Sequence, residues 1–347
     1  MDSHALGRWT LVPRSIGLVL LSLATALAPA TPALACDVCA VYTATEQSEG
    51  RNGPRLGLAV QYTHFGTLKE NGDEIANPNH ESLDSVITQL VLGYQFTPRI
   101  GVQLNLPLIT RQFERFHDGH RERGNVSGPG DMTLLAHVLV HSIVTEQSVF
   151  RFSLLGGIEL PTGDSEFLGE ELAEIRRAGA RRLVMRHSTP GPGDEHEEPS
   201  GVHGHDLALG SGSVDWLVGG EVFWSWKRAF VTGALHYAIR TEGDFGYRFA
   251  NELSWSGGPG AYLLLGHDYS LALQARLNGE TKGKDHQAGA TLHDTAITNL
   301  YLGPRVLFTW GTSLAVEGAL ELPVYQNQTS VQIVPDYRLR AAALWRF

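Results

Sequence analysis

The chain is poor in charge, cysteine and methionine. Charged residues make up 18% of its 347 positions, against roughly 25% in a soluble globular domain, and only two cysteines and three methionines are present. Two cysteines exclude a fold held together by a disulfide framework. The net charge of −10 argues against a nucleic-acid partner, because neutralising phosphates requires clustered Lys and Arg. Glycine is abundant at 39 residues, and low charge with high glycine favours a sheet protein.

Residues 1–35 have the pattern of a secretory signal peptide. Arg8 and Arg14 form a basic start, 16–28 is apolar, and Ala33-Leu34-Ala35 matches an A-x-A cleavage site. The alternative of a membrane anchor is weakened by the short apolar core and the prolines that end it. Beyond residue 36, no apolar run approaches the roughly 20 residues of a transmembrane helix. The sequence therefore predicts export across the inner membrane, a periplasmic segment over 36–53, and the main domain over 54–347.

The main domain repeats one pattern, in which segments of alternating apolar and polar residues are separated by turns. In 100–108 the even positions are all apolar, whereas Gly101, Gln103 and Asn105 occupy the other face. Such alternation predicts strands with one apolar and one polar face. Twelve segments show it: 54–66, 84–96, 99–112, 130–142, 148–161, 210–226, 228–241, 246–264, 269–281, 295–310, 312–325 and 331–347.

Three features favour a bacterial outer-membrane barrel over a soluble all-β protein. An even number of such strands is what those barrels require. Short turns near Pro98, Glu146, Lys227, His267 and Gly311, which we place in the periplasm, alternate with mostly longer outward links, although 242–245 and 326–330 are short. The last strand ends in Phe347, similar to the terminal signal that the barrel assembly machinery reads. We thus expect an all-β, transmembrane antiparallel barrel of about twelve strands, contacting lipid in the bacterial cell outer membrane.

The side chains of the two faces support this placement. Ring side chains favour the membrane interface, and those near the short turns are Tyr94, Phe96, Trp224, Trp226, Trp310, Trp345 and Phe347. Charged side chains on the polar face must avoid lipid, where each costs about 2–4 kcal/mol near the midplane. The predicted lumen residues are Arg111, Arg151, Glu159, Asp215, Glu221, His236, Arg240, Arg248, Glu252, Arg276, Glu280, Arg305, Glu317, Glu321, Arg338 and Arg340. This lining suits either a water-filled pore or a salt-bridged filling of the barrel.

The link 162–209 is too long to be a simple connection. Its first half, 166–186, has helical periodicity with an acidic start and a basic end, which suits the helix dipole. The sequence predicts one long extracellular loop containing a helix. That helix either folds into the mouth as a constriction or lies on the surface.

Several short motifs resemble those of a known family. Gly128-Pro129-Gly130-Asp131, Leu160-Pro161-Thr162-Gly163-Asp164, Gly210-Ser211-Gly212-Ser213 and Leu322-Pro323-Val324-Tyr325-Gln326 are similar to elements of transporter-like outer-membrane barrel proteins grouped with the meta-pathway of phenol degradation. The resemblance covers most of 84–347. It implies a passive porin-like channel for small, including aromatic, molecules, but not a particular solute. From the residues alone, Pro161 and Pro323 would end strand pairing and Gly163 would permit a tight turn.

Two groups of residues are candidates for metal or redox chemistry. Cys36-Asp37-Val38-Cys39 can form a local disulfide, bind a soft metal or exchange thiols in the periplasm. His187, His196, His203 and His205 lie among acidic residues of the long loop and are candidate transition-metal ligands, or only solubilising residues. The long loop is predicted on the extracellular side of the membrane and the cysteine pair in the periplasm. The two groups therefore cannot form one site.

No enzyme signature is present: P-loop, HExxH, GxSxG and Rossmann motifs are all missing. A lipase site on the lipid-facing wall also fails, because His137, His141 and His236 fall on the polar face. We predict a non-enzymatic channel for passive transport of small solutes, aromatic or metal-related, that requires no cofactor. The alternative is a filled structural, adhesive or metal-sensing barrel that does not conduct.

Overall fold

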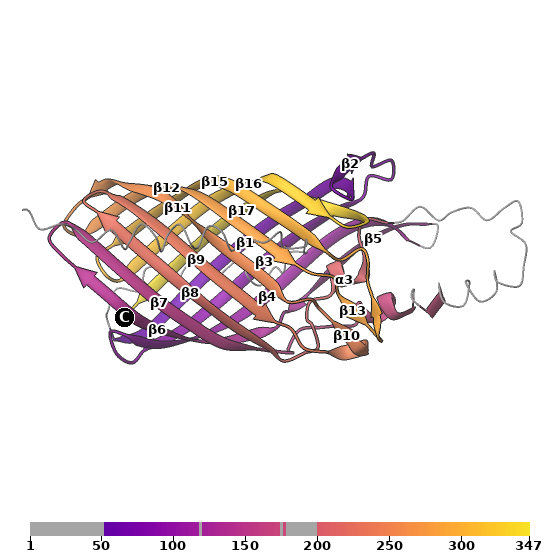
Figure 1. The fold of residues 1–347 in the computed structure, drawn as a ribbon, viewed down its shortest axis with the longest axis horizontal. Coiled ribbons are helices and arrows are strands. Elements are labelled where there is room, and N and C mark those ends of the chain that lie inside the picture. Colours follow the sequence, from indigo (N-terminus) through magenta and orange to yellow (C-terminus); the bar gives the residue numbers. More distant parts are fainter. Residues whose placement is uncertain (1–51, 118–119, 174–175, 178–199) are drawn as a thin grey trace, which may run out of the picture. The chain divides into compact units, whose positions relative to one another are not determined.

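The computed structural model describes residues 52–117, 120–173, 176–177 and 200–347. The expected leader, Cys36, Cys39, His187 and His196 lie outside these residues. Within them, twelve antiparallel strands form a closed barrel, because β1 pairs with β3 on one side and with β17 on the other (Figure 1). The predicted fold class is confirmed.

The barrel strands follow one another around the wall in chain order. They are β1 (Gly53–Glu70), β3 (Ser82–Gln95), β4 (Ile100–His117), β6 (Met132–Val144), β7 (Ser148–Leu160), β8 (Asp215–Trp226), β9 (Ala229–Ile239), β11 (Glu252–Leu265), β12 (Tyr269–Lys282), β15 (Ile297–Trp310), β16 (Leu314–Gln328) and β17 (Val331–Arg346). The short elements at the long-loop end are β2 (Asp73–Ile75), β5 (His120–Pro129), α3 (Gly204–Leu207), η2 (Asp244–Gly246), β10 (Tyr247–Arg248), β13 (His286–Gln287) and β14 (Ala290–Thr291). None of the described helices is long and apolar enough to cross a membrane.

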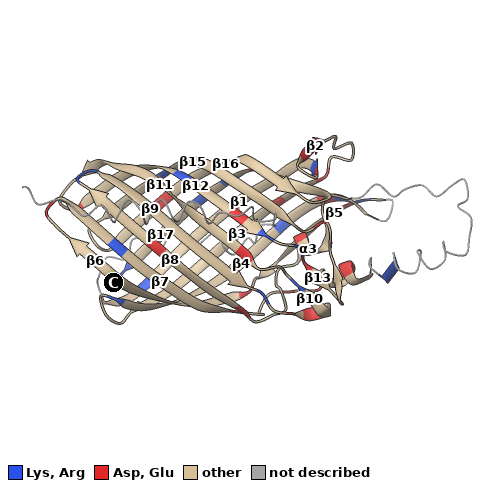
Figure 2. Cartoon of the chain, in the orientation of Figure 1, with Lys and Arg blue, Asp and Glu red and all other residues tan. Residues whose placement is uncertain are grey.

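The alternation in the sequence becomes an outward and an inward face of the wall. On β4, Leu108 is 60% exposed on the outside, whereas Gln103 and Asn105 face inward and are buried. An apolar outward face removes polar side chains from lipid, and closure of the sheet leaves no unpaired edge. Many charged residues of the wall strands are consequently buried. Figure 2 shows charged positions along the wall strands and at the ends of the barrel.

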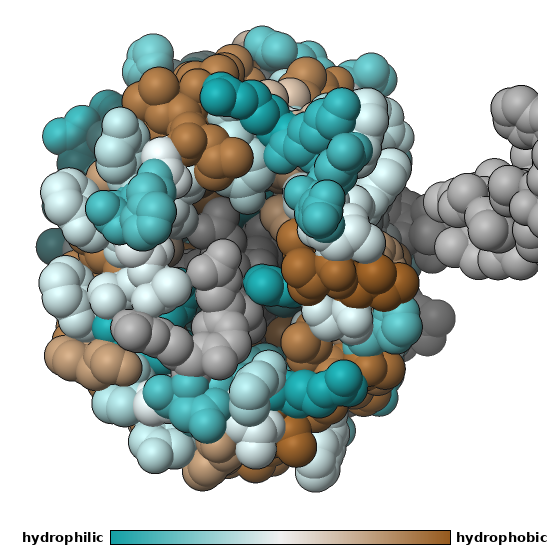
Figure 3. Space-filling view, turned by 90° about the vertical axis from the view of Figure 1, so that its left-hand side faces the viewer, coloured by the Kyte–Doolittle hydropathy of each residue, from teal (hydrophilic) through white to brown (hydrophobic). Residues whose placement is uncertain are grey.

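The two ends of the barrel differ. At one end, which we call the short-turn end, short turns join β3 to β4, β6 to β7, β8 to β9, β11 to β12 and β15 to β16. Lys227 and Gly311 take positive φ angles in these turns. The seven predicted interface rings lie on the outward face at this end, 46% to 65% exposed. Figure 3 views this end, where hydrophobic and hydrophilic side chains share the rim.

Two predicted strands begin later than the sequence suggested. The segment expected over 246–264 joins the barrel wall only at Glu252, after η2 and the short strand β10. Phe245 (φ 57°) and Gly246 (φ 63°) adopt left-handed conformations that interrupt extended pairing. The segment expected from 210 becomes strand at Asp215, after Gly212 turns the chain with φ 67°.

A β-bulge changes the face of one histidine. The register between β6 and β7 shifts between Leu139 and His141, so that His141 pairs with the outward residue Phe152. The His141 ring lies 6.1 Å from that of Phe150 on the outer surface. The expectation that His141 lies on the polar face was wrong, because an inserted residue reverses the alternation after it.

Candidate channel lumen

The structure places nearly all of the predicted lumen residues inside the barrel. Ten are buried: Arg111, Glu159, Asp215, Arg240, Glu252, Arg276, Glu280, Arg305, Glu321 and Arg338. Five on inward positions are half-buried: Arg151, Glu221, His236, Glu317 and Arg340. The exception is Arg248, which is exposed on β10 at the long-loop end because the wall strand starts only at Glu252.

Many of these charged side chains form ion pairs with residues of nearby strands on the inward face. Arg240 donates to Glu159 and, at 2.9 Å, to Asp215, and its other terminal nitrogen lies 3.9 Å from Glu252. The side chain of Arg240 is 3% exposed. Removing one partner from such a buried group would leave an uncompensated charge at a cost of about 3–5 kcal/mol.

A second set of pairs lies on the strands that follow around the wall, β12 to β17. Arg338 binds Glu280 through two guanidinium nitrogens and stacks 4.2 Å from the centre of the Tyr301 ring. Arg340 donates to Glu321 at 2.9 Å. Paired charges of this kind fit both interpretations of the polar face, a pore wall and a salt-bridged filling.

Residues 200–211, which we call the mouth segment, return from the long loop into the open end of the barrel. Val202 and Leu207 are almost completely buried against the inward side chains of Leu83 on β3 and Phe113 on β4. Leu209 packs on a second apolar group of inward residues that includes Ile109. The mouth segment, which belongs to the second half of the loop, therefore narrows this opening. Much of the helix predicted over 166–186 lies outside the described residues, so its position in the mouth or on the surface stays a prediction.

Backbone hydrogen bonds fix the mouth segment to the wall. The amide of Gly201 donates to the buried carboxylate of Glu81 at 2.7 Å, and the Gly201 carbonyl accepts from the amide of Ile333 at 2.9 Å. A side chain at position 201 would collide with Leu68. Arg111 donates to the carbonyl of Ala208. Sequence reasoning did not single out Glu81, because a lone acidic residue in a loop carries no pattern.

A buried ion pair joins the mouth segment to the helical start of the loop. Nδ1 of His205 lies 2.8 Å from a carboxylate oxygen of Glu171, with both side chains almost fully buried. Burial opposes the charged imidazole, but Asp206 and Glu171 outweigh it and raise the pKa of His205 to about 10. Burial also opposes the charged carboxylate, yet His205 and His203 lower the pKa of Glu171 to about 2.

The histidines do not assemble a metal centre in the part of the chain that the structure describes. The rings of His203 and His205 stack with their centres 5.4 Å apart, and His205 is engaged by Glu171. No group of three or more side chains able to hold a metal ion occurs among the described residues. The cysteine pair, His187 and His196 lie outside them.

Three of the four family-like motifs meet at one carboxylate. Oδ1 of Asp131 accepts hydrogen bonds from the amides of Thr162 and Gly163, at 3.0 and 2.8 Å. Oδ2 accepts from the amide and hydroxyl of Ser211, at 2.7 and 2.8 Å. Gly163 and Gly210 pack backbone to backbone, so neither position has room for a side chain. These motifs anchor both ends of the long loop.

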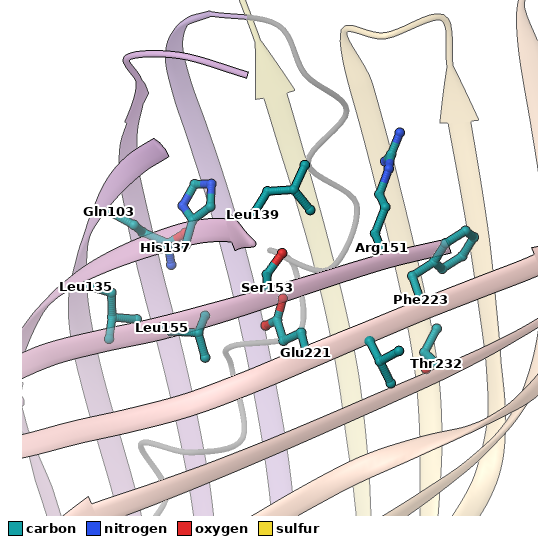
Figure 4. Close-up of a pocket in the computed structure, with 11 residues that line it drawn as sticks. Gln103, Leu135, His137, Leu139, Arg151, Ser153, Leu155, Glu221, Phe223 and Thr232 are labelled. Carbon is teal, nitrogen blue, oxygen red and sulfur yellow. The ribbon is translucent and has the colours of Figure 1, made fainter. Parts of the chain in front are cut away.

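Beneath the mouth segment lies a lumen cavity of about 990 Å³. Its apolar lining includes Phe65, Ile109 and Leu209, and its charged lining includes Arg111 and Glu252. Two further cavities, of about 640 and 790 Å³, lie toward the short-turn end. Figure 4 shows the first of these, with Gln103, His137 and Arg151 among the side chains around it.

Comparison with known proteins identifies the fold. An outer-membrane channel from Pseudomonas putida F1 superposes with a TM-score of 0.56 over 86% of this chain and 96% of its own, at 15% identity. The β domain of the Bordetella autotransporter BrkA has a TM-score of 0.45 over 86% of this chain and all of its own, at 10% identity. No family model and no curated protein matches the sequence.

The first of these likenesses shows the fold, an outer-membrane β-barrel. Together with the apolar outward face, this fold places the chain in a bacterial outer membrane. The grouping with the meta-pathway of phenol degradation stays a prediction.

Proposed function

We propose that this protein is a passive outer-membrane channel for small solutes. The observation that carries the proposal is the inward face of the barrel, which is polar along its length and borders several cavities. The structurally similar protein from P. putida F1 is named a channel, which agrees with this proposal. Apolar patches within a polar wall would let a solute with an apolar body cross without losing all of its favourable contacts.

The mouth segment sets the resting state of the proposed channel. It occupies the outer opening and contacts inward residues of β3 and β4. We infer that solutes pass around this segment or displace it, so that conduction is low until its anchors loosen. The buried His205–Glu171 pair is one such anchor.

Single-channel conductance in planar lipid bilayers tests the proposal. Purified folded protein is expected to give discrete current steps in KCl. A variant with residues 201–209 replaced by a short glycine–serine linker should give larger steps, since the linker leaves Asp131 and Ser211 in place. The channel proposal would be contradicted if the wild type and the linker variant both migrate as folded, heat-modifiable barrels and neither gives a current.

A non-conducting filled barrel is the second candidate. It is favoured by the ion pairs on the wall, in which Arg240 and Arg338 each bind buried carboxylates. The same bilayer experiment distinguishes the two functions. Assembly through recognition of Phe347 by the barrel assembly machinery belongs to either candidate and remains a proposal.

A further inference from the structure

The cavity of about 790 Å³ at the short-turn end combines arginine with aromatic side chains. Phe223 on β8, Phe230 on β9 and Tyr262 on β11 form a continuous wall, with ring centres 6.0 Å apart for the first pair and 5.2 Å for the second. Arg151 on β7 and Arg346 on β17 line the same cavity.

Arg151 differs from most of the other lumen arginines in its lack of a carboxylate partner within the described part of the chain. Arg151 has neither a hydrogen-bond nor an ion-pair partner among the described residues, and in Figure 4 it extends away from Glu221. The nearby carboxylate of Glu221 lies 3.9 Å from His236 instead. By contrast, Arg240, Arg305, Arg338 and Arg340 all bind a glutamate.

A third arginine adds to the positive charge of this end. Arg55 on β1 is 6% exposed and stands directly opposite Arg346 in the strand register. Its Nη2 atom has no hydrogen-bond partner within the described chain, and Arg346 donates to the carbonyl of Thr312. Like charges directly opposite one another destabilise a sheet; Arg346 lines the cavity, whereas Arg55 does not.

We propose that this cavity, which we call the inner aryl pocket, binds small aromatic carboxylates. The role of these carboxylates as transported solutes rests on the proposed channel function. A planar ring would pack against Phe223, Phe230 and Tyr262, and the carboxylate would accept paired hydrogen bonds from Arg151. The cavity beneath the mouth segment differs from the inner aryl pocket, because the carboxylates of Asp131, Glu159 and Glu252 border it.

Both halves of the ligand are required by this arrangement. A small aliphatic acid would use the arginines but leave the aromatic wall against water. A neutral aromatic alcohol would use the wall but leave the guanidinium of Arg151 without an anionic acceptor. Charge-assisted hydrogen bonds of this kind weaken as salt screens the exposed part of the site.

Calorimetric titration of the full-length, folded protein in detergent tests the pocket, with benzoate as the probe. Benzyl alcohol and acetate serve as the neutral and the aliphatic comparison. Benzoate is expected to bind at least about tenfold more tightly than either, a difference of roughly one charge-assisted hydrogen bond. Arg151→Gln and Phe223→Leu should each weaken benzoate binding about tenfold.

A matched control is Arg99→Gln, which removes an exposed arginine from a turn at the same end. It should leave benzoate affinity unchanged. Equal benzoate affinity in wild type and Arg151→Gln, or equal affinity for benzoate and benzyl alcohol, would overturn the proposal.

Conductance in KCl, measured on the same preparations, separates this proposal from the channel itself. Protein that conducts but does not bind benzoate would keep the channel and overturn the inner aryl pocket. Protein that binds benzoate through Arg151 but never conducts would support the pocket and remove the channel function.

Discussion

The hydroxyl of Ser211 donates to the carboxylate of Asp131 at 2.8 Å, although eighty residues separate the two along the chain. Asp131 precedes β6 and Ser211 precedes β8, so this contact joins the chain before the two strands that flank β7, at the long-loop end. The same carboxylate holds the amides of Thr162 and Gly163. One buried acid thus fixes where the long loop leaves the barrel and where it returns.

Asp131→Asn is therefore expected to destabilise the long-loop end. The amide nitrogen cannot accept from Ser211, which leaves buried donors unsatisfied at a cost of about 1–3 kcal/mol. Protease cleavage within 162–209 should become faster in this variant, with the barrel still migrating as a folded species. A matched change, Asp268→Asn, alters an exposed acid in a turn and should have no effect. Equal cleavage rates in Asp131→Asn and wild type would contradict the anchoring role.

Conductance should depend on pH through His205 and Glu171. Because the pKa of His205 is raised from 6.5 to about 10, its stabilisation of the mouth segment is complete below pH 6.5 and is lost as the pH rises through 10. Because the pKa of Glu171 is lowered from 4.5 to about 2, its contribution is complete above pH 4.5 and is lost as the pH falls through 2. Bilayer conductance is expected to be lowest between these limits and to rise in alkaline solution.

The histidine variant supplies the control for that titration. His205→Gln removes the titrating group, so the alkaline rise should disappear and the conductance near pH 6 should already be high. Asp206 and Lys282, which also act on the charge of His205, are unchanged in this variant. An identical alkaline rise in wild type and His205→Gln would show that another group is responsible.

Gly163→Ala should open the mouth by a steric route. A methyl group at position 163 would lie 2.5 Å from the carbonyl oxygen of Leu209 and 2.8 Å from the Cα of Gly210. Because the obstacle is backbone, the mouth segment must shift, and larger current steps are expected. Gly156→Ala is the matched control, since the nearest atom to its new methyl group is 3.9 Å away. Similar conductance in both variants would argue against a close approach of the two loop ends.

Arg276→Glu is expected to shift ion selectivity toward cations. Arg276 faces the lumen on β12 and donates to the neutral side chains of Asn278 and Ser256. Reversing its charge makes the local potential more negative, which favours K⁺ over Cl⁻. The reversal potential across a KCl gradient measures this shift, and Arg228→Glu on an exposed turn is the comparison. A reversal potential unchanged from wild type would place Arg276 outside the conduction path.

Deleting Phe347 tests assembly separately from stability. The Phe347 side chain is 65% exposed, so its removal costs the folded barrel few contacts. We nevertheless expect much less protein in the outer-membrane fraction, because we propose that the barrel assembly machinery recognises the terminal ring. Phe96→Ala removes a similarly exposed ring at the same end and should assemble normally. Normal assembly without Phe347 would contradict the terminal-signal interpretation.

The strand pattern, and with it the barrel, could be predicted from the sequence. A period of two places alternate residues on opposite faces, and a charge cannot face lipid, so the faces of Arg276 and Arg338 follow directly from their positions. The same alternation would have assigned Arg55 and Arg346 to the lumen had it been followed to the strand ends. It failed at His141, where a bulge inserts one residue and reverses the faces, and at Arg248, where left-handed residues delay the strand.

Only the tertiary structure decided what occupies the lumen. Alternation describes a strand, and nothing in it fixes the path of a loop through the space that the strands enclose. The burial of Val202 and Leu207 and the pairing of His205 with Glu171 depend on the return of the loop into the mouth. The grouping of Phe223, Phe230 and Tyr262 depends on the register of neighbouring strands, which sets three distant residues side by side. Local sequence thus determined the wall, because each residue's face is a local property, whereas contacts across the enclosed space exist only once the barrel has closed.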